Sequence, residues 1–139
     1  MKKLFVISLL FTISLFADSK TLMYEIIGSV LDNLSTPKQK IIYSDDKDLL
    51  KALSKHYAIS QTCQESTFII LQKEQLPKEC QSKDIFVLNY NLLRSVPQSI
   101  GAFFFQKGRA NIVLLQPKLQ KHNIKVSPEL KPYLEEKIW

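Results

Sequence analysis

The chain has 139 residues, of which 45% are hydrophobic and 23% charged, and its formal net charge at pH 7 is +6. This length suits one compact domain with a hydrophobic core and leaves little room for a second domain. Because the positive charges are spread along the chain, they favour solubility or attraction to acidic partners and membrane surfaces, and they do not predict nucleic-acid binding.

Residues 1–17 have the pattern of a cleaved secretory signal peptide. The segment starts with a lysine pair, continues with a nearly unbroken apolar run over residues 4–16 and ends at the small residue Ala17. The apolar run is too short to span a bilayer. We therefore predict removal of residues 1–17 and export of residues 18–139 as a single periplasmic α/β domain. The alternative is a leader that is retained as a membrane anchor.

The first half of the exported chain predicts a helix, a strand and a second helix. Residues 19–34 place apolar side chains at intervals of one, three and four, which indicates an amphipathic helix that ends before Pro37. Residues 40–44 are β-branched and aromatic, as in a strand, and residues 49–57 return to helical spacing.

The middle of the chain predicts two buried strands. Residues 67–71 and 84–88 are continuous apolar runs, which are typical of strands inside a covered, mostly parallel sheet. Residues 73–80 between them predict a short helix or turn. Residues 89–93 lead into a short helix that ends before Pro97.

A β-hairpin is predicted next, and two helices follow it. Residues 100–105 and 110–115 are apolar strands, and Gly108 between them supplies the positive φ angle that a tight reversal needs. A short helix is expected over residues 117–122, with Asn123 as its left-handed stop. A last helix is predicted to begin at Ser127-Pro128, to bend at Pro132 and to carry Leu130, Tyr133, Leu134 and Ile138.

Together these elements predict an α/β fold. We expect a single three-layer domain with a central, mostly parallel sheet, a C-terminal β-hairpin and flanking helices.

Cys63 and Cys80 are the only cysteines. In an oxidising compartment they could close a disulfide loop that stabilises the fold by about 3 kcal/mol. The sequence leaves two buried free thiols open as the alternative, since it does not show that the two side chains meet. His56 and His122 lack the paired spacing of a structural zinc site, so we expect no metal.

The chain carries no recognisable catalytic or cofactor-binding motif. Its few glycines have no phosphate-cradling spacing, and neither a Gly-x-Ser-x-Gly elbow nor a Cys-x-x-Cys pair occurs. His56 and His122 lie near predicted helix ends, where histidines are usually surface residues. We therefore expect a protein that is not an enzyme and that needs no cofactor.

Polar side chains follow two of the predicted strands. Asp45 and Asp46 precede a predicted helix and are expected to cap it, and Asn89 and Asn91 lie where a predicted strand ends and leads into a short helix. The alternative is a small-ligand site that these four residues form at the ends of the parallel strands, as in a periplasmic binding protein associated with a transporter or sensor. An enzyme using Asp45, Asp46 or His56 is the third hypothesis.

The predicted hairpin carries the candidate partner-binding surface. Phe103, Phe104 and Phe105 place rings on both faces of one strand, so most of this apolar area must be core, and the remainder could contact a partner or a second copy of the chain. Lys107 and Arg109 project at the tip, where they suit an acidic protein surface.

The order of elements resembles the YfiR-like family of small periplasmic proteins. The resemblance lies in the strand at 85–88, the hairpin segments at 99–105 and 111–114, the step at 123–127, and Ser44-Asp45-Asp46 at the first turn. The chain departs from that family in having one glycine before the penultimate strand and in the placement of its cysteines.

This resemblance implies a non-enzymatic periplasmic regulator in c-di-GMP signalling. Such a protein binds the sensor domain of an inner-membrane signalling protein, of the diguanylate cyclase type, and often dimerises. While bound it would hold the sensor inactive, and its release would let signalling proceed.

Overall fold

The computed structural model describes residues 19–73 and 75–138. The predicted leader, residues 1–17, lies outside them. Among the described residues, seven strands form one mixed sheet and two further strands form a small separate sheet. The large sheet contains, in spatial order, β3 (Ala58–Ile59), β2 (Ile41–Ser44), β4 (Phe68–Leu71), β5 (Asp84–Val87), β6 (Gly101–Gln106), β7 (Arg109–Leu115) and β9 (Leu134–Glu135). The small one pairs β1 (Leu34–Ser35) with β8 (Lys125–Val126).

The sheet is mostly parallel, as the continuous apolar runs predicted. Every neighbouring pair in it runs parallel except the hairpin of β6 and β7. The α/β single-domain fold with a C-terminal hairpin and flanking helices is confirmed. The helices are α2 (Ser19–Asp32), α3 (Lys47–Leu53), α4 (Tyr90–Ser95) and α5 (Gln116–Lys121), with the 3₁₀ turns η1 (Lys78–Cys80) and η2 (Pro128–Tyr133).

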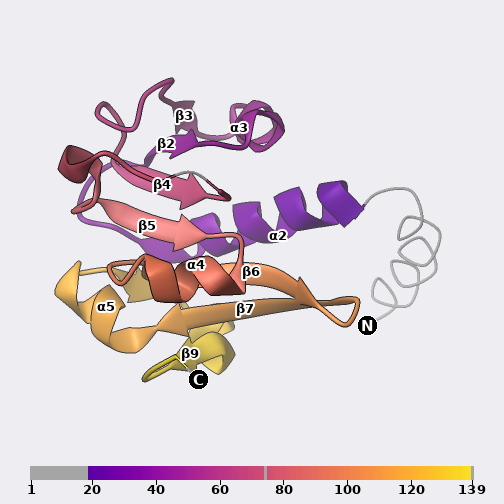
Figure 1. Cartoon of the computed structure of the whole chain (residues 1–139). Coiled ribbons are helices and arrows are strands. Elements are labelled where there is room, and N and C mark those ends of the chain that lie inside the picture. The colour runs from indigo at the N-terminus through magenta and orange to yellow at the C-terminus, as the bar shows by residue number, and fades with distance from the viewer. Residues whose placement is uncertain (1–18, 74, 139) are drawn as a thin grey trace.

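Both faces of the sheet are covered, which explains why its central strands β4 and β5 are apolar at every position except Asp84. Phe68 and Ile70 of β4 point into a core shared with α2, α3 and α5, whereas Ile69 and Leu71 point into a second core that contains Leu93 of α4. Figure 1 shows α2 behind the sheet and α4 in front of it. The fold is therefore a layered α/β domain with two separate cores.

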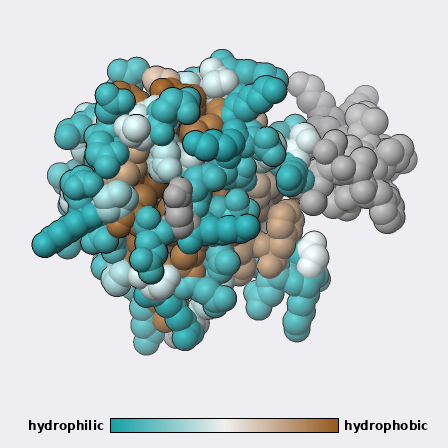
Figure 2. Space-filling view, turned by 45° about the horizontal axis from the view of Figure 1, so that its top comes forward, coloured by the Kyte–Doolittle hydropathy of each residue, from teal (hydrophilic) through white to brown (hydrophobic). Residues whose placement is uncertain are grey.

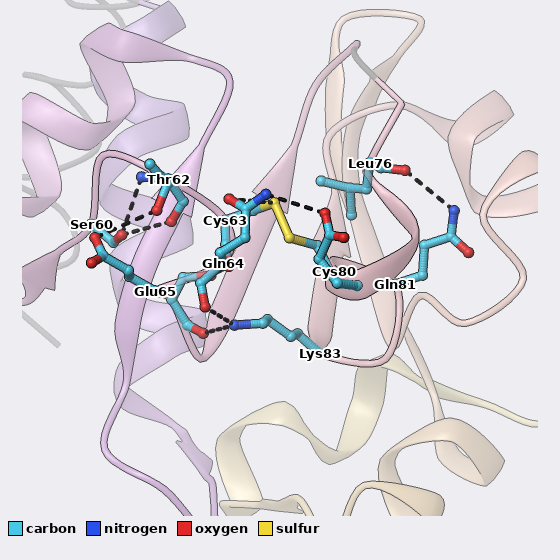
Figure 3. Close-up of a disulfide and its surroundings, with 11 residues drawn as sticks. Ser60, Thr62, Cys63, Gln64, Glu65, Leu76, Cys80, Gln81 and Lys83 are labelled. Atoms are coloured by element: carbon cyan, nitrogen blue, oxygen red, sulfur yellow. Dashed lines mark hydrogen bonds between the residues drawn. A yellow bond between two sulfur atoms is a disulfide. The ribbon is translucent and has the colours of Figure 1, made fainter.

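A disulfide joins Cys63 to Cys80, so of the two alternatives left open by the sequence the structure has the cross-link. It ties the loop before β4 to η1, and both cysteines are buried in the second core. Lys83 lies near the disulfide (Figure 3). Its Nζ donates to the backbone oxygen of Gln64 at 2.6 Å and also to that of Ser66. The cross-link and this lysine together fix the loop that leads into β4.

The predicted C-terminal helix is wrong beyond Tyr133. Residues Pro128–Tyr133 form a 3₁₀ turn, and Leu134 then pairs with Leu114 of β7 as part of β9. Pro132 has no backbone N–H and cannot continue an α-helix, while β7 offers unpaired backbone groups at the edge of the hairpin. Ser127 precedes η2 as predicted, but its hydroxyl donates to Oδ1 of Asn33 at 2.6 Å and does not cap the turn.

Candidate functional site

The β6–β7 hairpin projects past the ends of the neighbouring strands (Figure 1). Gln106 pairs with Arg109, so Lys107 and Gly108 alone make the turn, with φ angles of 53° and 75°. Two successive residues with positive φ are the signature of a type I′ turn, whose twist matches that of the strands. The positive φ predicted for Gly108 is confirmed, and Lys107 shares it.

The base of the hairpin is held tightly. A Cβ atom added at Gly101 would lie 2.3 Å from the backbone oxygen of Val113, so β6 and β7 approach each other where only glycine fits. Gly101 is itself buried and pairs with Leu114 of β7. The projecting end therefore stands on a rigid base.

The three phenylalanines of β6 pass from the core to solvent along the strand. Phe103 is fully buried, and its ring meets that of Phe105 edge to face, with centroids 5.2 Å apart. Phe104 lies on the other face and contacts the ring of Tyr90, also at 5.2 Å. Phe105 is 44% exposed. Of the three predicted contact residues, Phe103 is thus a core residue that a partner cannot contact. The exposed ring of Phe105 packs against Phe103 and remains accessible to a partner.

The tip of the hairpin is basic. Lys107 and Arg109 are exposed and, with Gln106 and Asn111, they line a shallow pocket of about 450 Å³. The Asn111 amide donates to the Arg109 backbone oxygen at 3.0 Å. Within residues 19–73 and 75–138 neither Lys107 nor Arg109 has an acidic partner. The tip therefore offers two cations, and the exposed ring of Phe105 lies on the face of the hairpin opposite to Arg109.

Figure 2 shows one face of the molecule with hydrophilic side chains over most of it and apolar surface in separate patches. Exposed large apolar side chains are few among the described residues, namely Phe105 and Tyr133. A broad apolar docking face is therefore not a feature of this side, and a local projecting element is the stronger candidate for recognition.

The four residues of the alternative ligand site lie after β2 and β5, and most of their side-chain oxygens are already occupied. Asp46 caps α3, because its Oδ1 accepts from the backbone N–H groups of Asp48 at 3.1 Å and Leu49 at 3.2 Å. Asn89 caps α4 by accepting from the backbone of Asn91 at 2.8 Å. The predicted capping role of Asp46 is confirmed, whereas the cap at Asn89 was not predicted.

Asp45 has a different structural role that the sequence did not reveal. Its two carboxylate oxygens accept from the backbone N–H groups of Gln72 and Lys73, each at 2.7 Å. The side chain thereby ties the end of β2 to the end of β4. Asn91 contributes its backbone N–H to the cap of α4, and its side chain is exposed.

His122 follows α5 at its C-terminal end, as predicted, but it is not a freely exposed residue. Its Nδ1 lies 2.7 Å from Oδ1 of Asp84, and the two side chains are only 13% and 18% exposed. His56, by contrast, is exposed after α3. The Asp84–His122 pair was missed because no local spacing links residues on β5 and α5.

A second feature that the sequence did not reveal is a groove of about 630 Å³ between α2 and α3. Its lining includes Tyr24, Asp32, His56 and Tyr57. The Tyr57 hydroxyl donates to Oδ1 of Asp32, and burial followed by this hydrogen bond raises the pKa of Tyr57. Burial also raises the pKa of Tyr24, aided by Asp46 and Asp48.

Neither a metal centre nor a membrane span is found in the part of the chain that the structure describes. There, no group of three or more histidine, cysteine or acidic side chains is placed to hold a metal ion. No helix of the described ranges is long and apolar enough to cross a bilayer.

Comparison of the chain with family models, curated proteins and solved structures found no match.

Proposed function

We propose that this protein is a non-enzymatic periplasmic regulator that docks, through the tip of its β6–β7 hairpin, on an acidic surface of the sensor domain of an inner-membrane signalling protein of the diguanylate cyclase type. The observation that carries the proposal is the projecting tip with Lys107 and Arg109, which have no acidic partner among the described residues, while the same hairpin carries the exposed Phe105 ring on the face opposite to Arg109. The kind of partner follows from the family resemblance, and the mode of docking from the hairpin.

The disulfide supports the compartment in this proposal. Cross-links such as Cys63–Cys80 form and persist in oxidising environments and are rare in the cytosol. The bond also lies inside the fold, with both cysteines buried, which suits a structural role in an exported domain.

The tip combines two contributions to binding that act at different stages. Exposed cations accelerate encounter with an acidic surface and fix its orientation, an effect that salt weakens. Covering the exposed part of the Phe105 ring would add about 1 kcal/mol of binding free energy. Because the type I′ turn and the Gly101 contact hold the hairpin in one shape, little conformational entropy is lost on docking.

In-cell photo-crosslinking tests the proposal. A photoreactive amino acid placed at Lys107 should give a crosslink to an inner-membrane protein with a periplasmic sensor domain, whereas the same amino acid at the exposed Lys78 on η1 should not. Binding of that sensor domain to the purified protein should then weaken at least tenfold in Lys107→Glu/Arg109→Glu, and most strongly at low salt.

Lys51→Glu/Lys55→Glu is the matched control, since it makes the same charge change at exposed positions on and after α3. Equal weakening by both double variants would show a general effect of net charge and would contradict the hairpin as the docking site. Crosslinks that form equally from positions 107 and 78 would do the same.

A further inference from the structure

A second candidate site lies away from the hairpin, at the edge of the sheet where β4 and β5 begin. Here the structure has a polar pocket of about 290 Å³. Its lining includes Lys38, Thr67, Ser82, Lys83, Asp84 and His122. Asp84 opens β5 and Thr67 directly precedes β4, so this amino-edge pocket is at the opposite end of these strands from Asp45 and Asn89.

The walls of the amino-edge pocket are fixed by hydrogen bonds. The Thr67 hydroxyl donates to the backbone oxygen of Gln39 at 2.6 Å and accepts from the backbone N–H of Ile41 at 2.8 Å. The Ser66 hydroxyl, also in the lining, donates to the backbone oxygen of Cys63 at 2.7 Å. A ligand would therefore meet a preformed surface, which lowers the cost of ordering on binding.

The carboxylate of the pocket already has a partner, whereas several donors do not. Asp84 is engaged by His122. Among the described residues, Lys38 and Ser82 have no side-chain partner, and Lys83 uses two of its three N–H bonds on backbone oxygens. The Nδ1 atom of His122 faces Asp84, and the His122 side chain also lines the pocket.

A pocket whose unused groups are an ammonium, a hydroxyl and a further ammonium N–H suits a ligand with several acceptor oxygens and negative charge. We propose that the amino-edge pocket binds the phosphate group of inorganic phosphate or of a small phosphate monoester. This site is separate from the hairpin and does not depend on the docking proposal.

Titration of the isotope-labelled protein, followed by backbone amide chemical shifts, tests this site. Inorganic phosphate and glycerol 3-phosphate are added separately, each against sodium chloride at equal ionic strength. The expected result is saturable shifts at residues 66–67 and 82–84 and none at the hairpin tip. Tighter binding of glycerol 3-phosphate would identify a monoester as the ligand, and equal binding would identify phosphate itself.

Substitutions at two exposed residues, Lys38 and Ser82, identify the groups that bind phosphate and should not destabilise the fold. Lys38→Gln should weaken phosphate binding about tenfold, because it removes a charge-assisted hydrogen bond, and Ser82→Ala should weaken it less. Lys121→Gln makes the same charge change one residue from His122 but outside the pocket, so it should bind phosphate as the unmodified protein does. Shifts that sodium chloride reproduces, or equal weakening by Lys38→Gln and Lys121→Gln, would overturn the proposal.

Discussion

Oδ1 of Asp84 and Nδ1 of His122 lie 2.7 Å apart although the two residues are separated by 38 positions in the sequence. The pair joins the first residue of β5 to the end of α5, and it forms one wall of the amino-edge pocket. It therefore links the stability of the fold to the geometry of a candidate binding site.

Removing the imidazole should destabilise the protein. We expect His122→Ala to lower the free energy of unfolding by about 1–3 kcal/mol, because Asp84 is then left mostly buried without its partner. Urea denaturation followed by circular dichroism measures this. His56→Ala is the control, since His56 is exposed, and it should change stability by less than about 0.5 kcal/mol. Similar losses in both variants would refute a structural role for the pair.

The cross-link should contribute substantially to stability. Replacing both Cys63 and Cys80 by alanine should lower the free energy of unfolding by about 3 kcal/mol, as expected for a loop with a sequence separation of 17. A reducing agent should lower the melting temperature of the unmodified protein and leave that of the double variant unchanged. Quantitative labelling of two free thiols in the native, unreduced protein would contradict the disulfide.

Two glycine-to-alanine changes should act in opposite directions. Gly101→Ala should destabilise by about 1–3 kcal/mol, because its Cβ would lie 2.3 Å from the backbone oxygen of Val113. Gly28→Ala should stabilise by up to about 1 kcal/mol, since Gly28 lies inside α2 and an added Cβ meets nothing within 4 Å. Denaturation midpoints of the two variants and the unmodified protein measure these changes in stability. An unchanged midpoint for Gly101→Ala would contradict the close approach of β6 and β7 at this position.

Stability should fall steeply as the pH rises above 10, in part because of Tyr57. Burial and the hydrogen bond to Asp32 raise the pKa of Tyr57 above its ordinary value of 10.0. The unfolded chain therefore loses this proton at a pH where the folded protein keeps it, so alkaline pH favours unfolding. Tyr57→Phe should show a shallower fall in melting temperature between pH 9 and 11, and part of the fall should remain because the pKa of Tyr24 is raised too.

Tyr133→Phe serves as the comparison for this titration, since Tyr133 is an exposed tyrosine. It should keep the slope of the unmodified protein. If Tyr57→Phe keeps that slope as well, Tyr57 does not contribute to the alkaline transition.

The sequence predicted the long elements well because their apolar patterns are repeated over many residues. The helix expected at 19–34 is α2, and the continuous runs at 67–71 and 84–88 contain β4 and β5. The strands β1, β3, β8 and β9 were not predicted, since each is only two residues long and depends on a distant partner for its hydrogen bonds. A pattern of two residues carries too little periodicity to indicate a strand.

The candidate sites likewise contain features that local sequence predicted and features that depend on distant parts of the chain. The hairpin with Lys107 and Arg109 near its tip follows from local sequence, because a glycine between two strand-like apolar runs indicates it over short range, whereas the type I′ turn was seen only in the structure. Three identical phenylalanines do not show which of them is buried. Phe103 is core and Phe105 is exposed because β6 continues past the last residue that pairs with β5, and the sequence does not show where that pairing ends.

The sequence by itself determined the class of fold, the hairpin and the cap of α3, all of which depend on residues close together in the chain. Only the tertiary structure decided that Cys63 meets Cys80, that Asp84 meets His122 and that Asp45 ties β2 to β4. The physical reason is that each of these contacts closes a long loop. Its existence therefore depends on how the whole sheet packs and not on any local preference.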